Sequence, residues 1–232
     1  DGELNYLDGW PHITGLAGSL HLDSPDLDIH LKEALTLGGS LVKDSGKIHL
    51  SPDNKGITRL QVSGQMAGPL AEGLAYFHKT PLQEVVQHNF DSWAATGQHR
   101  TTFNISMPLG VEAAEPRVKL DTRISAASLR IGDLNLDFTE LSGPLQFDSV
   151  DGLTSKALTG KVMGGAFTAS VGSSAVAGGG FKTLASVEGR ATLEAYKRWS
   201  PIFLLDPVTG DLGYSARLNL NTASGDLVFD LT

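Results

Sequence analysis

The chain has no cysteine among its 232 residues. Disulfide bonds and thiolate metal sites are therefore excluded. The absence of cysteine does not identify the cellular compartment, because cytosolic and periplasmic proteins can both do without it. The sequence also has no run of about 18 apolar residues, the length that a membrane-spanning helix needs. No charged start followed by an apolar run is visible, so no secretory signal is indicated. Because the chain opens on Asp1 and stops inside an alternating pattern at 226–231, we expect it to be a piece of a longer protein.

Positive charge is scarce as well. Eighteen Lys and Arg residues face 26 Asp and Glu residues, which gives a formal net charge of −8. Nucleic-acid phosphates are bound by clustered Lys and Arg, so this composition argues against a nucleic-acid partner. It also argues against simple electrostatic docking onto an anionic membrane surface.

The dominant pattern in the sequence is an alternation of apolar and polar residues with a period of two. It is clear at residues 27–31, 103–107 and 214–220, and turn-forming residues separate such runs at 51–56 and 206–210. This period places apolar side chains on one face of a β-strand. The sequence therefore predicts an all-β protein with a meandering antiparallel sheet.

Three stretches depart from this alternation and predict short helices. Residues 69–77 and 81–93 carry apolar residues at helical spacing, each with proline at a plausible first helical position, and Thr80 suits an N-cap. Residues 192–199 predict a third short helix.

An internal repeat accounts for the order of these segments. Residues 16–24 align with residues 141–149, which brings Gly18 onto Gly143, and Gly64 aligns with Gly189 at the same offset of 125 positions. A glycine then opens a further strand in each half, at positions 97 and 210. We predict a tandem duplication, with a first unit at 1–125 that has a helical insert at about 69–93. The second unit would span 126–232 and have a short helix at about 192–199.

These motifs resemble the periplasmic region of the AsmA-like family, and within it the YhdP-type proteins. The resemblance is carried by the recurring L-x-G-x-L-x-[LF] strands, the Gly-Pro-Leu at 68–70, the Thr-Pro-Leu at 80–82 and the strand that leads to Pro108. Residues 128–147 followed by 163–167 resemble the strand-turn-strand element of that family. The resemblance covers residues 10–232.

The resemblance implies both a fold and a function. Members of the family are anchored in the inner membrane of Gram-negative bacteria and extend a long antiparallel sheet across the periplasm. That sheet curls into a β-groove that carries phospholipid acyl chains towards the outer membrane. It also implies neighbouring repeats of the same chain, and membrane contacts made by other parts of the parent protein. The residues expected to line the groove are Leu20, Leu22, Ile29, Leu31, Phe103, Ile105, Leu134, Leu136, Leu145, Phe147, Leu218 and Leu220.

The alternation alone leaves a second interpretation open. A sheet with one apolar face must cover that face, either with a second protein layer or with lipid. Both arrangements place the same residues inward. The alternative is therefore a structural or protein-binding envelope module with a closed β core.

No catalytic, metal or cofactor site is predicted. Ser40 and Lys43 match the S-x-x-K pattern of serine acylases, but positions three apart on a strand point to opposite faces. Asp26, Asp28 and His30 share a strand face with a loose metal-ligand spacing, and a solvated polar face explains them better. We therefore expect a non-enzymatic protein.

Overall fold

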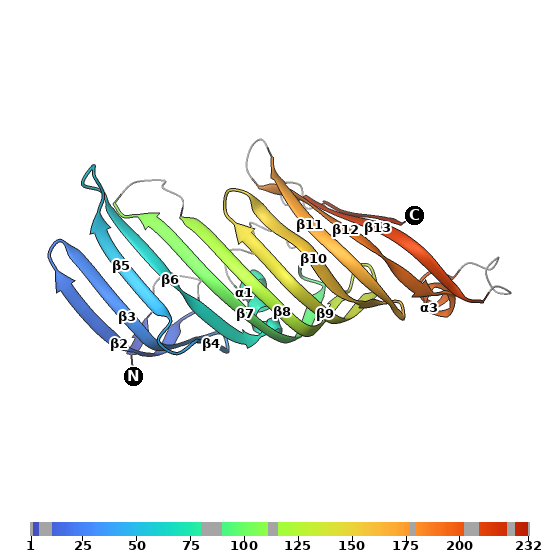
Figure 1. The fold of residues 1–232 in the computed structure, drawn as a ribbon, viewed down its shortest axis with the longest axis horizontal. Helices are drawn as coiled ribbons and strands as arrows, with labels where there is room; N and C mark the ends of the chain where they lie inside the picture. The colour runs from blue at the N-terminus through green and yellow to red at the C-terminus, as the bar shows by residue number, and fades with distance from the viewer. Residues whose placement is uncertain are drawn as a thin grey trace.

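A single antiparallel β-sheet dominates the computed structural model of the chain (Figure 1). The structure describes residues 2–4, 11–79, 90–110, 116–176, 180–201, 209–221 and 226–231. Within these residues there are fourteen strands and two helices, α1 (Leu70–Lys79) and α3 (Leu193–Trp199). The predicted fold class, an all-β chain with short helices, is confirmed.

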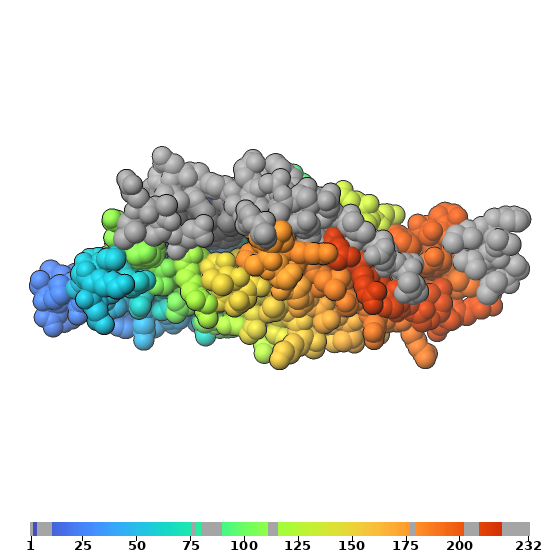
Figure 2. Space-filling view, turned by 90° about the horizontal axis from the view of Figure 1, so that it is seen from above, coloured from blue at the N-terminus to red at the C-terminus, as the bar shows by residue number. Residues whose placement is uncertain are grey.

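The strands follow one another along the long axis of the molecule (Figures 1 and 2). In chain order they are β1 (Gly2–Leu4), β2 (Ile13–Asp23), β3 (Asp26–Thr36), β4 (Gly39–Leu41), β5 (Gly46–Pro52), β6 (Thr58–Pro69), β7 (Trp93–Pro108), β8 (Arg117–Ile131), β9 (Leu136–Asp148), β10 (Gly152–Val162), β11 (Gly165–Ala175), β12 (Phe181–Thr192), β13 (Asp211–Asn221) and β14 (Asp226–Leu231).

Each strand pairs with its neighbours in sequence, so the sheet is a meander. The strand order departs from this meander at β4 and β5, which share a single place between β3 and β6. Residues 42–45 interrupt that place, and Asp44 there has a positive φ of 59°. β4 and β5 therefore behave as one strand with a break in it.

The strand registers assign each side chain to one of two faces, because directly opposed residues in an antiparallel pair lie on the same face. One row runs through six strands and is apolar throughout: Leu20, Ile29, Ile48, Val62, Ile105 and Val118. The next row towards the helices contains Gly64, Phe103, Leu120, Phe147 and Leu153. We call this side of the sheet the apolar face and the opposite side the polar face.

The sheet curls towards its apolar face. Cα atoms of β10 and β12 come within 8 Å although β11 lies between them. Two strand spacings in a flat sheet would give about 9.5 Å. The rings of Phe147 in β9 and Phe181 in β12 also meet on this face, with centroids 6.4 Å apart.

Irregular residues in neighbouring strands accompany the curl. The register shifts between Thr96 and Gln98 in β7 and between Ile124 and Ala127 in β8. Gly97 has a φ of 99°, and Ala126 has a φ of 45°. Such bulges bend a strand and increase its twist. Gly97 therefore marks a bulge inside β7, whereas the sequence predicted that it would open a strand.

Two of the three predicted helices are present. α1 follows Pro69 directly, and α3 begins after Thr192, whose side chain accepts a hydrogen bond from the Ala195 N–H at 3.3 Å. The predicted helix at 81–93 lies mostly outside the described residues, as do the Thr80 cap and most of the turn at 206–210. The last residues of the helix predicted at 81–93 are not helical, because 90–92 form a turn and Trp93 begins β7.

A cluster of buried apolar residues lies along the edge of the sheet where the two helices lie. It consists of Ile124, Ala127, Leu136, Leu141, Val162, Phe167 and Ala169. Leu70 of α1 and Trp199 of α3 pack against this cluster from above the apolar face. Trp199 also donates a hydrogen bond from Nε1 to the backbone oxygen of Leu134 at 2.7 Å, which ties α3 to the β8–β9 turn.

The order of elements in the two halves of the chain runs in parallel. Four strand positions, a helix and two further strands make up β2 to β8, and the same order recurs from β9 to β14. Gly64 and Gly189 occupy equivalent places in β6 and β12. The two halves share one sheet, since residue 125 falls inside β8 and β8 pairs with β9. Tandem duplication with a boundary at 125 remains a prediction.

Candidate functional site: the apolar face of the curled sheet

The residues predicted to line a groove can now be placed on the sheet. By register, eleven of the twelve lie on the apolar face, at Leu20, Leu22, Ile29, Leu31, Phe103, Ile105, Leu136, Leu145, Phe147, Leu218 and Leu220. Leu220 is placed by its backbone alone, because its side chain is outside the described set. The structure thus brings these positions to one surface, and whether that surface binds lipid is a separate question.

Leu134 differs from the expectation. It lies in the four-residue turn at 132–135 between β8 and β9, not in a strand. Asn135 closes this turn with a φ of 49°, a conformation that asparagine tolerates better than most residues. The Leu134 side chain packs at the helix-covered edge, against the buried cluster.

Cover over the apolar face is uneven. Leu136 is 4% exposed in the buried cluster, whereas Leu20 and Leu22 are 64% and 66% exposed near the other end of the sheet. Most of the remaining predicted residues are half-buried. Among the described residues, no large side chain is more than 98% buried.

A small polar patch interrupts the apolar face beside α1. His99 and Thr101 of β7 and Thr122 of β8 form it, and we call these three residues the polar patch. His99 Nδ1 lies 2.9 Å from Thr101 Oγ1, which in turn lies 2.9 Å from Thr122 Oγ1. Burial lowers the pKa of the His99 imidazole below its usual 6.5, so the neutral ring is favoured.

A second polar group on the apolar face is the phenol of Tyr214. It lies on β13 directly opposite Gly189, and burial raises its pKa to about 12. Within the described part of the chain, its Oη has no hydrogen-bond partner.

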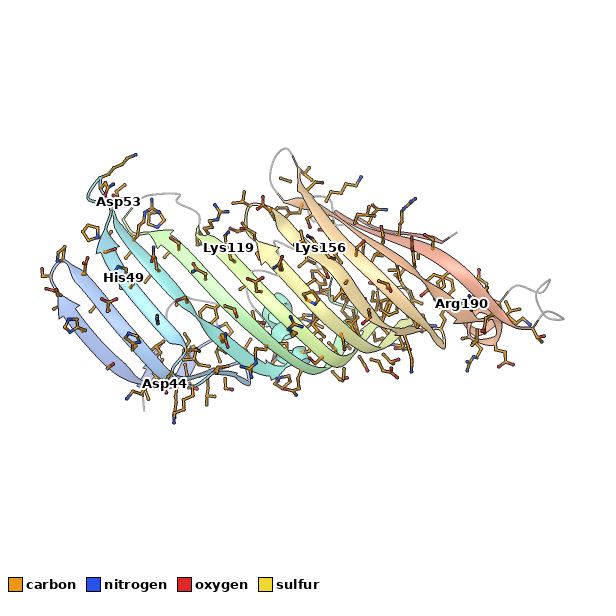
Figure 3. The ribbon with its side chains drawn as sticks, viewed as in Figure 1. Asp44, His49, Asp53, Lys119, Lys156 and Arg190 are labelled. Atoms are coloured by element: carbon orange, nitrogen blue, oxygen red, sulfur yellow. The ribbon has the colours of Figure 1, made fainter. Side chains whose placement is uncertain are left out.

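The polar face carries the acidic and histidine residues singled out from the sequence. Asp28 accepts a hydrogen bond from His49, with 2.7 Å between Oδ1 and Nδ1. His49 and Lys119 are both labelled in Figure 3, and their registers place them on this face. No group of three metal-ligating side chains occurs in the described ranges.

The S-x-x-K pair is not assembled as a catalytic pair. Ser40 lies in β4 and bonds the backbone oxygen of Ala67 at 3.4 Å. Lys43 is exposed in the break between β4 and β5.

Sequence reasoning missed several residues of the apolar face. Leu153, Val171 and Phe181 lie on it by register, as do the three residues of the polar patch. The signal for the patch was present in the sequence, because the alternation at Phe103 extends back to Thr101 and His99. Leu153, Val171 and Phe181 were harder to find, since small or polar residues separate them.

These features define the class of protein, a single antiparallel sheet curled towards one predominantly apolar face. Comparison with protein-family models then matches residues 1–232 to the family described as YhdP protein. The chain belongs to the YhdP family, a non-enzymatic, transport-type family of lipid-transport-related envelope proteins. Searches of curated proteins and of solved structures found no significant match. Neither described helix has the length and apolar character needed to cross a membrane.

Proposed function

We propose that the chain is a periplasmic segment of an inner-membrane-anchored protein that conducts phospholipid towards the outer membrane. The acyl chains would lie on the apolar face, and other parts of the parent protein would reach the two membranes. The observation that carries this proposal is the continuity of the apolar rows from β2 to β10 on the side towards which the sheet curls.

The dimensions and energetics support a lipid ligand. A seven-residue stretch of strand spans about 23 Å, comparable to an extended acyl chain. Each buried CH₂ is worth about 0.8 kcal/mol, so a tail held against the apolar face is strongly favoured over the same tail in water. Because the rows continue from strand to strand, a lipid can move along them without exposing its whole tail.

The proposed role is non-catalytic. Movement along the groove breaks no covalent bond and needs no cofactor. Ser40 and Lys43 lie in a strand and in the break that follows it, and Asp28 is engaged with His49. The residues singled out as candidate nucleophile, base or metal ligands are therefore arranged as parts of a structural sheet.

Substitution at the exposed end of the apolar face tests this function with little risk to folding. The variant Leu20→Glu with Leu22→Glu places two charges where the wild-type side chains are 64% and 66% exposed. The matched control is Ser19→Glu with Gln61→Glu, because both residues are exposed on the polar face, opposite His30 and His49. Both variants carry the same change in net charge.

Native mass spectrometry with lipid extraction supplies the readout, on the chain purified from a membrane-rich lysate. Wild type and control are expected to retain phospholipid. The Leu20, Leu22 variant should retain at least tenfold less, since the loss of even one leucine contact removes about 1.5–3 kcal/mol of apolar burial and about 1.4 kcal/mol already corresponds to a factor of ten. A lipid-free wild-type monomer with a sharp unfolding transition would contradict the proposal. That result would favour a protein-binding envelope module with a closed core.

A further inference from the structure

The polar patch is unusual because it lies between apolar rows. Thr101 and Thr122 oppose each other, and the same row continues to Met66 on one side and Leu145 on the other. The row above contains Phe103. A hydroxyl that only needed a solvated position would lie on the polar face, as Thr102 does.

The hydrogen bonds within the patch leave one donor unused. A neutral histidine and two hydroxyl groups carry three donor hydrogens, and the two contacts at 2.9 Å use two of them. If His99 Nδ1 donates to Thr101 and Thr101 donates to Thr122, the Thr122 hydroxyl hydrogen is free. If Thr101 Oγ1 accepts from both neighbours, its own hydroxyl hydrogen is the free one. If both hydrogen bonds run in the opposite direction, from Thr122 to Thr101 and from Thr101 to His99 Nδ1, the free donor is Nε2–H of His99.

The surroundings favour the first of these arrangements. His99 Nε2 faces α1, where a methyl group added to Gly73 would lie 3.6 Å away. Thr122 is only partly buried and lies on the side of the patch away from this helix contact. The Thr122 hydroxyl is therefore the donor best placed to meet a molecule on the apolar face.

The chemistry of the patch selects a neutral acceptor. The neighbouring side chains on the same face, Met66, Phe103, Ile124 and Leu145, carry no charge. A phosphate or a free carboxylate would therefore lie there without a cation, which is costly in an apolar environment. An ester carbonyl needs a single donor and carries no charge.

We propose that His99, Thr101 and Thr122 form a binding station for the ester carbonyl of an acyl lipid. The inference rests on the proposed function and deepens it, because it assigns the register that the lipid takes on the sheet. With the ester at Thr122, the tail lies against Phe103, Ile105 and Met107, which extend about 20 Å along β7 beyond Thr101. The station thus favours ester-linked lipids over lipids that have the same tails but no carbonyl.

The test compares two lipids that differ only in this group. The 232-residue chain is incubated with vesicles of diester phosphatidylethanolamine or of its diether analogue, matched in chain length, and bound lipid is measured by native mass spectrometry. Wild type is expected to retain the diester lipid about fivefold better, the ratio that one net hydrogen bond gives. Thr101→Val with Thr122→Val removes the hydroxyls at nearly constant shape and should reduce the ratio of diester to diether retention to about one.

Two controls separate the hydroxyl from the fold. Thr102→Val makes the same change next to Thr101 on the polar face and should keep the preference. Thr122→Ser keeps the hydroxyl and should also keep it, even if the double valine variant proves unstable. Equal retention of both lipids by wild type would contradict the carbonyl-binding station without contradicting lipid binding on the apolar face. A preference for the diester lipid that survives in the double variant would have the same meaning. Retention of neither lipid would overturn the proposed function itself.

Discussion

Gly64 in β6 pairs directly with Phe103 in β7, and the Phe103 ring lies across the glycine. A methyl group added to Gly64 would come within 2.9 Å of the ring. The same arrangement recurs in the second half of the sheet, where Gly189 in β12 pairs with Tyr214 in β13. An aromatic ring over a cross-strand glycine covers backbone that glycine leaves bare. The two pairs therefore keep the apolar face continuous across the strands that flank each helix.

Alanine at position 64 is expected to destabilise the fold by about 1–3 kcal/mol, because the new methyl group must displace the Phe103 ring or Leu41, 3.2 Å away. The urea unfolding midpoint measures this cost. Gly172→Ala is the matched control, since no atom lies within 4 Å of a methyl group there and the residue is exposed in β11. Its effect should be close to zero. Equal destabilisation by the two changes would contradict the assignment of the cost to the contact with the Phe103 ring.

Phenylalanine at position 214 is expected to be tolerated, since Phe103 holds the equivalent place opposite Gly64. In the described structure Tyr214 Oη makes no hydrogen bond, so its removal should leave stability at neutral pH unchanged or raise it by up to about 1 kcal/mol. Chemical denaturation compares Tyr214→Phe with wild type. A loss of more than about 1 kcal/mol would mean that the hydroxyl has a partner.

The raised pKa of Tyr214 gives this variant a second signature. The folded-state pKa of Tyr214 is about 12 and the ordinary value is 10, so below pH 10 the phenol is protonated in both the folded and the unfolded chain and its titration does not affect stability. As the pH rises from 10 to 12 the unfolded chain loses this proton first, and the folded chain loses stability. Tyr214→Phe should therefore lose less stability than wild type between these two pH values, and Tyr196→Phe provides the comparison. Identical curves for wild type and Tyr214→Phe would contradict the assigned burial.

Local sequence patterns were sufficient for the sheet but not for its shape. Alternation with a period of two is a property of each strand alone, so it placed Leu20 and Ile105 on one face correctly. The curl depends on bulges at residues such as Ala126 and Glu140, which have φ values of 45° and 53°. Alanine and glutamate both disfavour a positive φ, so tertiary packing must stabilise this conformation at the two positions. The curl could not be predicted from the residues involved.

The misplacement of Leu134 has a local cause. Leu134, Leu136 and Phe138 alternate as a strand does, but Gly132, Asp133 and Asn135 are turn-forming residues. These turn residues determine the local structure more strongly than the alternation does.

The helix that follows Thr192 was predictable because its N-cap is a local interaction.

Acid is expected to destabilise the chain through His99. Burial lowers the pKa of this imidazole from 6.5, so the unfolded chain takes up a proton more readily than the folded chain as the pH falls through that value. Stability should therefore decline between pH 7 and pH 5, and His99→Gln should flatten the decline. Urea denaturation at several pH values measures the slope, with His21→Gln on the polar face as the control. A slope that His99→Gln leaves unchanged would contradict the prediction.

The acidic residues with lowered pKa values titrate in a separate range. Backbone hydrogen bonds from Lys55 and Ile57 lower the pKa of Asp53, and one from Val150 lowers that of Asp148, each from 3.8. Their contributions are present above pH 3.8 and are lost as the pH falls below it. They therefore do not obscure the effect of His99.

The attachment of α3 should depend on Thr192. Its side chain caps the helix through the Ala195 N–H, and Thr192→Ala is expected to cost about 1 kcal/mol, whereas Thr192→Ser keeps the acceptor and should cost less. Hydrogen exchange distinguishes a local from a global effect. Because Trp199 joins α3 to the backbone of Leu134, loss of the cap should accelerate exchange at both 193–199 and 132–135, while β2 and β3 stay protected. Faster exchange of the helix alone would show that the Trp199 bond does not couple α3 to the turn. The helix would then cover the edge of the apolar face without stabilising it.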